Sequence, residues 1–246
     1  MISIIVPVLN EAEGLALHLQ ALQAFRVEGH ELIVVDGGST DQSVHIAQPL
    51  CDKLLHSPKG RALQMNAGAE HAEGHLLLFH HCDSTLPPDA LSLLAPIANA
   101  QPCWGRFDVQ LDERKGLLAL VGHMMNLRSR LTGIATGDQS IFVSRQLWRQ
   151  IGGIPIQPLM EDIELSTRLK KLQKPICFHA KVTTSARRWQ KNGTIKTILF
   201  MWQLRLRYFF GDSPEHLVRL YYPDVKPANH HAHSKTEQVS GSSSQP

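Results

Sequence analysis

The sequence has few cysteines, no motif that pairs them and no long apolar run. Its four cysteines are widely separated along 246 residues, and none belongs to a CxxC pair. Disulfide bonds are therefore not expected, and a reducing cytoplasm is the expected compartment. The chain opens on the apolar run ISIIVPV with no basic segment before it, so we expect no signal peptide. No apolar stretch reaches the length of about 18 residues that a membrane-spanning helix requires.

A strong excess of one charge is also missing. The 25 basic and 22 acidic residues leave a net charge of +3, which is too small to predict a nucleic-acid partner. Hydrophobic residues make up 43% of the chain and charged residues 19%, a balance typical of globular proteins and not of disordered chains. A chain of this length can bury a full core as one α/β domain.

The first half of the chain alternates apolar runs with segments of helical periodicity. Three runs predict strands buried in a sheet: ISIIVPV, ELIVVD and HLLLFHH. Between them, EAEGLALHLQALQAF and GRALQMNAGAEHA predict helices. This order predicts an α/β fold of Rossmann-like type, with a mostly parallel, twisted sheet flanked by helices. The later segment CWGRFDVQLD alternates like a half-exposed strand.

Polar residues follow each predicted strand. Asn10 and Glu11 come after the first strand, DGGSTD after the second, and Asp83 just after the third. Ligands of parallel α/β sheets bind beyond the carboxyl ends of the strands, so these residues should share one edge of the sheet. Asp83 offers the carboxylate oxygen that Mg²⁺ or Mn²⁺ prefers, although substrate phosphates or another side chain must complete such a site.

The segment DGGSTD predicts a tight turn between a strand and a helix. Gly38 allows a positive φ and a close approach of a ligand, and Ser39 can cap the following helix. Asp36 can accept a hydrogen bond from a ribose hydroxyl or a base N–H. A turn with a capping acid explains the same residues equally well, so both interpretations stay open. No GxGxxG pattern occurs, and a dinucleotide-binding fingerprint is not predicted.

Basic residues stand at two places where an anion can bind. Arg61 begins a predicted helix, where a cation opposes the helix dipole unless an anion is bound. Further along, Arg187, Arg188 and Trp189 are adjacent. Guanidinium groups can hold phosphate in a bidentate fork, and tryptophan offers a flat face to a sugar ring or a base. Solvated surface cations beside one packed tryptophan are the alternative.

Two acids, Glu161 and Asp162, are adjacent at the start of a predicted helix in LMEDIELSTRLKK. Acids stabilise the positive amino-terminal end of a helix, which explains the pair as a cap. A catalytic base that faces a reacting hydroxyl explains it as well. The segment by itself does not separate the two functions.

Six motifs, taken in order, resemble the family-2 glycosyltransferases of the GT-A fold. They are SIIVPVLNE, LIVVDGGSTD, GRALQMNAGA, the strand-ending Asp83, TGDQSIFVSR and MEDIELSTRL. GRALQMNAGA and the Arg-Arg-Trp run are most similar to the bacterial radical-SAM/selenodomain-associated transferase 2 subgroup. The resemblance implies transfer of a sugar from a UDP- or GDP-linked donor to an unidentified hydroxyl acceptor, with inversion and with Mg²⁺ or Mn²⁺ as cofactor.

The resemblance also implies a set of donor-binding residues. They are Pro7, Asn10, Glu11, Asp36, Gly38, Ser39, Arg61 and Asp83. Asp83 matches the last acid of the family's DxD motif, whereas His81 stands at the position of the first acid. His179, on a late predicted strand, is implied as a second metal ligand beside Asp83.

The acidic pair and the Arg-Arg-Trp run receive roles in the same way. Asp162 takes the position of the general base, and Glu161 would orient the acceptor or the helix start. Arg188 would stabilise the leaving diphosphate. Arg187 and Trp189 are implied to contact the diphosphate or the acceptor.

The resemblance divides residues 1–225 into parts of a single domain. The donor half covers about residues 1–100, the acceptor half about 101–190, and an amphipathic helix about 191–211. Residues 226–246 are almost free of apolar side chains and are predicted to be a disordered tail. The aromatic and basic residues of the helix suit peripheral contact with the inner face of a membrane and a lipid acceptor, although packing as a core helix explains them equally well.

Two other functions stay open. A nucleotidyltransferase also uses an α/β sheet and metal-bound carboxylates, but PVLNEAEGL lacks the glycine-rich, basic signature expected there. A catalytically silent domain that binds a nucleotide sugar or a protein partner explains the missing first acid of the DxD motif. Release of UDP from a UDP-sugar would separate the transferase from the silent domain.

Overall fold

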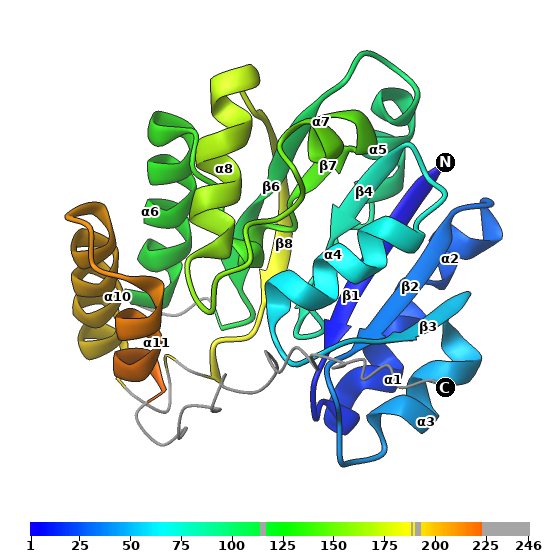
Figure 1. Ribbon diagram of the computed structural model, residues 1–246, viewed down its shortest axis with the longest axis horizontal. Coiled ribbons are helices and arrows are strands. Elements are labelled where there is room, and N and C mark those ends of the chain that lie inside the picture. Colours follow the sequence, from blue (N-terminus) through cyan, green and yellow to red (C-terminus); the bar gives the residue numbers. More distant parts are fainter. Residues whose placement is uncertain (114–116, 188, 190–192, 223–246) are drawn as a thin grey trace, which may run out of the picture.

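The computed structural model describes residues 1–113, 117–187, 189 and 193–222. The predicted disordered tail, residues 226–246, lies outside the described residues, and so does Arg188. The described chain folds around an eight-stranded sheet with the order β3-β2-β1-β4-β7-β6-β8-β5 (Figure 1). Its strands are mostly parallel and helices flank them, so the predicted α/β class is confirmed.

The amino-terminal half forms the parallel part of the sheet. Its strands are β1 (Ile2–Val8), β2 (Glu31–Asp36), β3 (Lys53–His56) and β4 (Leu76–Phe79). β1, β2 and β4 are buried along their whole length, as their continuous apolar runs predict. The carboxyl ends of β1, β2 and β4 therefore meet at one edge of the sheet.

The carboxyl-terminal half adds strands of mixed direction. They are β5 (Ser84–Thr85), β6 (Trp104–Leu111), β7 (Phe142–Ser144) and β8 (Ile176–Thr184). β7 is antiparallel to β4 and β6, and β5 is antiparallel to β8. The expectation of a half-exposed strand at CWGRFDVQLD is wrong, because α6 (Leu117–Thr132) packs over β6 and buries it. The polar residues in this strand pair internally, since Arg106 binds Asp108 in the interior.

Helices cover both faces of the parallel strands and create two cores. One face is covered by α1 (Ala12–Ala21), α2 (Gln23–Val27) and α5 (Ala90–Ala98). The opposite face is covered by α4 (Arg61–His71), α7 (Arg145–Gln150) and α8 (Glu161–Leu172). Successive β1 side chains enter different cores, with Ile4 in the first and Ile5 in the second. α3 (Ser43–Ala47) and η1 (Gln48–Leu50) connect β2 to β3.

The last helices pack on the segment that leads into α8. α10 (Thr194–Phe209) and α11 (Pro214–Tyr221) gather beside α6 and α8 at one end of the molecule (Figure 1). Leu204 and Leu217, both fully buried, form a small core with Leu159 and Met160. The predicted amphipathic helix is therefore present and is anchored by one face. Among the helices of the described ranges, none combines the length and the apolar character needed to cross a membrane.

Candidate active site

A cleft of about 620 Å³ opens at the carboxyl ends of the parallel strands. Its walls come from the β1–α1 loop, the β4–β5 loop, η2 (Gly137–Gln139), the start of α8, the end of β8, α10 and α11. Titratable side chains of both signs line it: Glu11, Glu13, His18, Arg61, His81, Asp83, Asp112, Asp138, Asp162, Arg187 and Arg205. This is where a parallel α/β sheet is expected to bind its ligand.

The structure brings part of the predicted site together. Six predicted residues line the cleft: Glu11, Arg61, Asp83, Asp162, Arg187 and Trp189. Five others lie in β1, at the end of β2 or in the neighbouring loops and do not line it: Pro7, Asn10, Asp36, Gly38 and Ser39. Glu161 is buried next to the cleft, and Arg188 lies outside the described residues.

Asp36 ends β2 and organises the turn that follows. It is 3% exposed, and its carboxylate accepts hydrogen bonds from the backbone N–H groups of Gly38 (3.0 Å) and Ser39 (3.1 Å). Burial raises the pKa of Asp36, but these hydrogen bonds outweigh it and hold the pKa below its ordinary value. Gly38 adopts a φ of +92°, which the turn requires. The capping function is therefore present, and Asp36 Oδ2 also lies 3.5 Å from His56 Nδ1.

Asn10 joins the β1–α1 loop to this turn. Its backbone N–H donates to Ser39 Oγ (2.9 Å), and its Oδ1 accepts from the N–H of Thr40 (2.8 Å). The next residue, Glu11, enters the cleft. Burial, and then the negative charge of Asp83, raise the pKa of Glu11. The two loops are thus held as one unit that carries Glu11 towards Asp83.

Asp83 stands where the two halves of the sheet meet. Ser84 Oγ lies 3.1 Å from Asp83 Oδ1 and 3.0 Å from Thr184 Oγ1. The short pairing of β5 with β8 therefore places Asp83 beside the end of β8, just before Arg187 and Trp189. This contact joins segments far apart in the sequence, so the cleft combines residues from both halves of the chain.

His179, the implied second metal ligand, is not brought to Asp83. Its side chain is 86% exposed and lies 3.0 Å from Arg130 Nη2 and 3.7 Å from Asp108 Oδ2. Thr184, which pairs with β5, lies further along β8 than His179. The strand between His179 and Thr184 contains a bulge and spans roughly 10–16 Å. Two ligands of one ion must lie within about 5 Å of each other, so His179 and Asp83 do not share a site.

Glu161 and Asp162 have different partners in the first turn of α8. Glu161 is 4% exposed, and its Oε1 lies 3.1 Å from Arg61 Nε at the start of α4. Burial raises the pKa of Glu161, and the Arg61 charge opposes this rise. Asp162 faces the cleft, where its Oδ2 accepts from the N–H of Gly137 (2.9 Å) and its Oδ1 from the N–H of Ile163 (2.8 Å). Only the second acid of the pair is therefore available to a ligand.

Asp138 is a cleft carboxylate to which no role was assigned from the sequence, although it lies within TGDQSIFVSR. Its Oδ1 is 3.9 Å from His81 Nδ1, and 45% of its side chain remains accessible from the cleft. The surrounding protein raises the pKa of Asp138, while His81 opposes the rise and Asp83 adds to it. At the preceding Gly137, a Cβ would lie 2.4 Å from His81 Cε1, so only glycine allows η2 to approach this closely.

The histidines behind Asp83 are packed rather than paired around a metal. His80 is fully buried, and its ring stacks on His18 with centroids 5.0 Å apart. His80 Nδ1 lies 2.8 Å from Ser140 Oγ. Burial lowers the pKa of His18 to about 4. His80 and His81 point to different environments, as expected for neighbours at a strand end, since His81 lines the cleft.

The cleft carboxylates fit a divalent cation that takes further ligands from a donor. Within the described ranges, no three His, Cys, Asp or Glu side chains are grouped closely enough to hold a metal ion by themselves. After burial, the charge of Asp83 is a cause of the raised pKa of both Glu11 and Asp138, so Asp83 repels each of these carboxylates. A cation bound by Asp83 and by diphosphate oxygens would relieve this repulsion, and oxygen ligands suit Mg²⁺ and Mn²⁺.

The fold is that of solved glycosyltransferases. The chain resembles the mannosyltransferase PcManGT from Pyrobaculum calidifontis, in complex with GDP-Man and Mn²⁺, with a TM-score of 0.61 and 18% identity over 92% of this chain and 65% of that one. It also resembles S. aureus TarS 1–349 in complex with UDP, with a TM-score of 0.61 and 20% identity over 75% of this chain and 60% of that one. These similarities define the fold, which is the GT-A glycosyltransferase fold.

The sequence comparison then assigns the family. The model of glycosyl transferase family 2 matches residues 3–136, and the chain belongs to this family. A segment of 93 residues is 36% identical to the PGL/p-HBAD biosynthesis glycosyltransferase of Mycobacterium bovis, over 35% of this chain and 36% of that protein. The match thus spans about a third of this relative's length. The family match includes Asp83 but ends before Asp162, whose role depends on the tertiary structure.

Proposed function

We propose that this protein transfers a sugar from a nucleotide-diphosphate sugar to a hydroxyl group, with inversion and with Mg²⁺ or Mn²⁺. The observation that carries the proposal is that Asp83 and Asp162, distant in the sequence, line one cleft together with Arg61 and Arg187. Glycosyl transfer needs a site for a charged diphosphate and a separate group that accepts the proton of the acceptor hydroxyl. The cleft contains candidates for both tasks.

Asp162 is the proposed general base. The N–H groups of Gly137 and Ile163 hold its two carboxylate oxygens, so the side chain is fixed in the cleft. In the reaction, the acceptor O–H bond breaks and its proton passes to Asp162 as the oxygen attacks the anomeric carbon. The bond between that carbon and the diphosphate oxygen breaks on the opposite face, which inverts the configuration. Glu161 acts through Arg61, because their ion pair fixes the start of α8 against α4.

The leaving diphosphate is proposed to lie between Asp83 and two arginines. A cation bound by Asp83 would neutralise charge that develops on the diphosphate. Arg61 and Arg187 line the same cleft and offer donors to phosphate oxygens. Trp189 offers a flat apolar surface for the sugar or the acceptor. Arg188 is proposed to assist the leaving group on the basis of the sequence resemblance alone.

The nucleoside is proposed to bind beside the loops that follow β1 and β2. Asp36 and the linked residues Asn10 and Ser39 form the rim next to Glu11. Pro7 supports this rim from within β1. Both UDP and GDP stay candidates, because TarS was solved with UDP and PcManGT with GDP-Man. Membership of the radical-SAM/selenodomain-associated subgroup stays a prediction.

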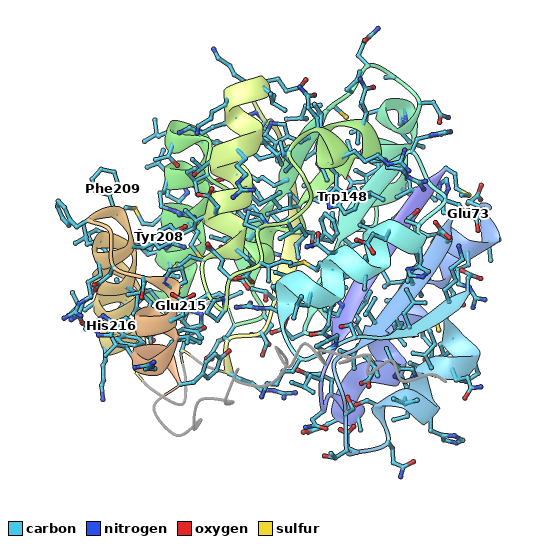
Figure 2. All side chains as sticks on the ribbon, in the orientation of Figure 1. Glu73, Trp148, Tyr208, Phe209, Glu215 and His216 are labelled. Atoms are coloured by element: carbon cyan, nitrogen blue, oxygen red, sulfur yellow. The ribbon has the colours of Figure 1, made fainter. Side chains whose placement is uncertain are left out.

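We also propose peripheral contact with anionic membranes through α10 and α6. Exposed apolar side chains follow one face of α10: Ile195, Leu199, Trp202, Leu206, Phe209 and Phe210. A second stripe follows α6: Leu117, Leu120, Met124, Leu127 and Leu131. Phe209 lies at the outer edge of the molecule (Figure 2). Neither helix contains Asp or Glu, whereas both carry basic residues, so their charge suits anionic lipids.

Flotation with phosphatidylglycerol vesicles tests the membrane contact. The wild type should float, and Trp202→Glu should remain at the bottom of the gradient. Leu172→Glu is a matched control, since it changes an exposed leucine on α8, outside both stripes. If the wild type fails to float, the membrane proposal is removed and the transferase proposal is untouched.

Nucleotide release tests the transferase proposal. The protein is incubated with UDP- and GDP-sugars, Mn²⁺ and candidate acceptors, and free nucleotide is measured. A catalytically silent binding domain is the second candidate, favoured by His81 at the first position of the DxD motif. Binding of a nucleotide sugar without turnover in any acceptor mixture would support it. Absence of nucleotide binding in thermal-shift experiments would contradict the transferase and leave a silent domain that binds a protein partner.

A further inference from the structure

Two arginines near Asp162 lack a partner for buried nitrogen atoms. Arg205, on α10, lines the cleft, and its Nε is buried without a hydrogen-bond partner. Arg128, on α6, has both Nε and Nη2 buried without a partner. Within the part of the chain that the structure describes, neither arginine forms an ion pair with a carboxylate. Two guanidinium groups are thus enclosed here with donors to spare.

The enclosure of these cations opposes stability. Burial lowers the pKa of Arg205, and burial together with the positive charge of Arg205 lowers the pKa of Arg128 to about 10. A half-buried cation that lacks an ion-pair partner is unfavourable, and apolar side chains of similar volume would be more favourable in the same place. Such local conflicts with stability are typical of binding sites.

Both arginines feel the charge of Asp162, and of the two only Arg205 lines the cleft. The acids that act electrostatically on both of them are Asp162 and Asp138. Glu11, at the other side, is influenced by Asp83 and Arg187 instead. An anion between Arg128 and Arg205 would therefore lie near the proposed base, on the side of the cleft where Arg61 also feels the charges of Asp162 and Asp138.

We propose that Arg205 and Arg128 form a subsite for a phosphate group of the acceptor, which directs the acceptor hydroxyl to Asp162. The inference rests on the proposed transferase function and adds the chemical class of the acceptor. Guanidinium groups bind phosphate through paired, charge-assisted hydrogen bonds, which would use the unpaired nitrogens. The phosphate group is unchanged in the reaction, because only the acceptor hydroxyl loses its proton and gains the sugar. It can belong to a lipid headgroup or to a small soluble molecule.

Phosphate binding to the nucleotide-saturated protein tests this inference. The full chain is first saturated with Mg²⁺ and whichever of UDP and GDP it binds, so that the diphosphate site is occupied, and inorganic phosphate is then titrated by calorimetry. The wild type should bind phosphate, and Arg205→Met and Arg128→Met should each weaken binding at least tenfold. Arg207→Met is a matched control, because Arg207 is on the same helix but pairs with Asp212 at 3.5 Å. Its phosphate affinity should stay within twofold of the wild type.

Thermal stability separates a binding role from a structural one. Without phosphate, Arg128→Met should melt at a higher temperature than the wild type, because a half-buried cation without an ion-pair partner is removed. If Arg128 instead stabilises the fold, Arg128→Met should melt at a lower temperature than the wild type. If a methionine variant fails to fold, Arg205→Gln gives the same binding test with a polar side chain. Phosphate affinity within threefold of the wild type in the folded variants would overturn the inference.

Two further arms identify the source of the phosphate. Glycerol 3-phosphate that competes with inorganic phosphate would indicate a soluble acceptor, whereas competition only by phosphatidic acid vesicles would indicate a lipid. Failure of both UDP and GDP to bind would contradict the transferase function itself. Binding of either nucleotide without binding of phosphate would remove the subsite alone.

Discussion

Replacement of Asp162 by asparagine should separate catalysis from folding. The amide keeps the shape of the side chain but cannot accept the acceptor proton, and a positioned base contributes about 10²–10⁴-fold to rate, or about 3–5 kcal/mol. The structural cost is smaller. The amide NH₂ group faces either the N–H of Gly137 or that of Ile163, so one backbone donor loses its acceptor. This loss costs about 1 kcal/mol and lowers Tm by about 2–4 °C in a chain of this size.

The assay measures nucleotide release and UDP binding on the same preparation. For Asp162→Asn, kcat should fall at least 100-fold, while the Kd for UDP should stay within threefold of the wild type. Glu164→Gln is the matched control, because Glu164 is in the same helical turn but pairs with Arg168 at 2.9 Å and does not line the cleft. Its kcat should stay within twofold. A kcat of Asp162→Asn within tenfold of the wild type would refute the assignment of the base.

Three other predictions follow from the packing and charge of the cleft. Gly137→Ala places a Cβ 2.4 Å from His81 Cε1, so thermal melts should show a loss of about 1–3 kcal/mol, and an unchanged melt would contradict the close approach. Folding lowers the pKa of His18 from 6.5 to about 4. Between pH 6.5 and about pH 4, His18 is therefore protonated in the unfolded chain but not in the folded chain, and the free energy of unfolding should fall as the pH decreases through this range. His18→Phe, which keeps the ring stack on His80, should reduce this pH dependence of stability in urea titrations. If stability depends on pH as strongly in the variant as in the wild type, His18 is not its source. Asp83→Asn should weaken UDP binding at least tenfold in Mn²⁺ but not in EDTA, since only the cation-dependent part is lost; equal losses under both conditions would exclude Asp83 as the cation ligand.

The fold was predictable because its signals are local. Continuous apolar runs at β1, β2 and β4 are typical of strands buried on both faces, and all three strands form as expected. The alternation in β6 was misleading, because Arg106 and Asp108 neutralise each other beneath α6 instead of facing water. Polar residues that alternate along a strand indicate a solvent-exposed face only where these residues have no partner inside the fold.

The site was predictable in part for the same reason. Glu11 and Asp83 follow buried strands, and a general rule for parallel sheets brings both to the cleft. Asp138 and Arg205 follow no such rule, since each enters the cleft through packing between distant segments. His179 shows the converse, because its place on β8 directs it to Arg130 and Asp108 rather than to Asp83.

By itself, the sequence determined the α/β class and the strand-end residues that reach the cleft, because burial and chain direction are encoded in short runs. Only the tertiary structure decided which partners Glu161 and Asp162 have. The approach of Arg61 from α4 takes the first acid into an ion pair, and the approach of Gly137 holds the second in the cleft. Adjacent carboxylates are equivalent in a sequence, and they become different only when distant segments supply one of them with a cation and the other with a backbone donor.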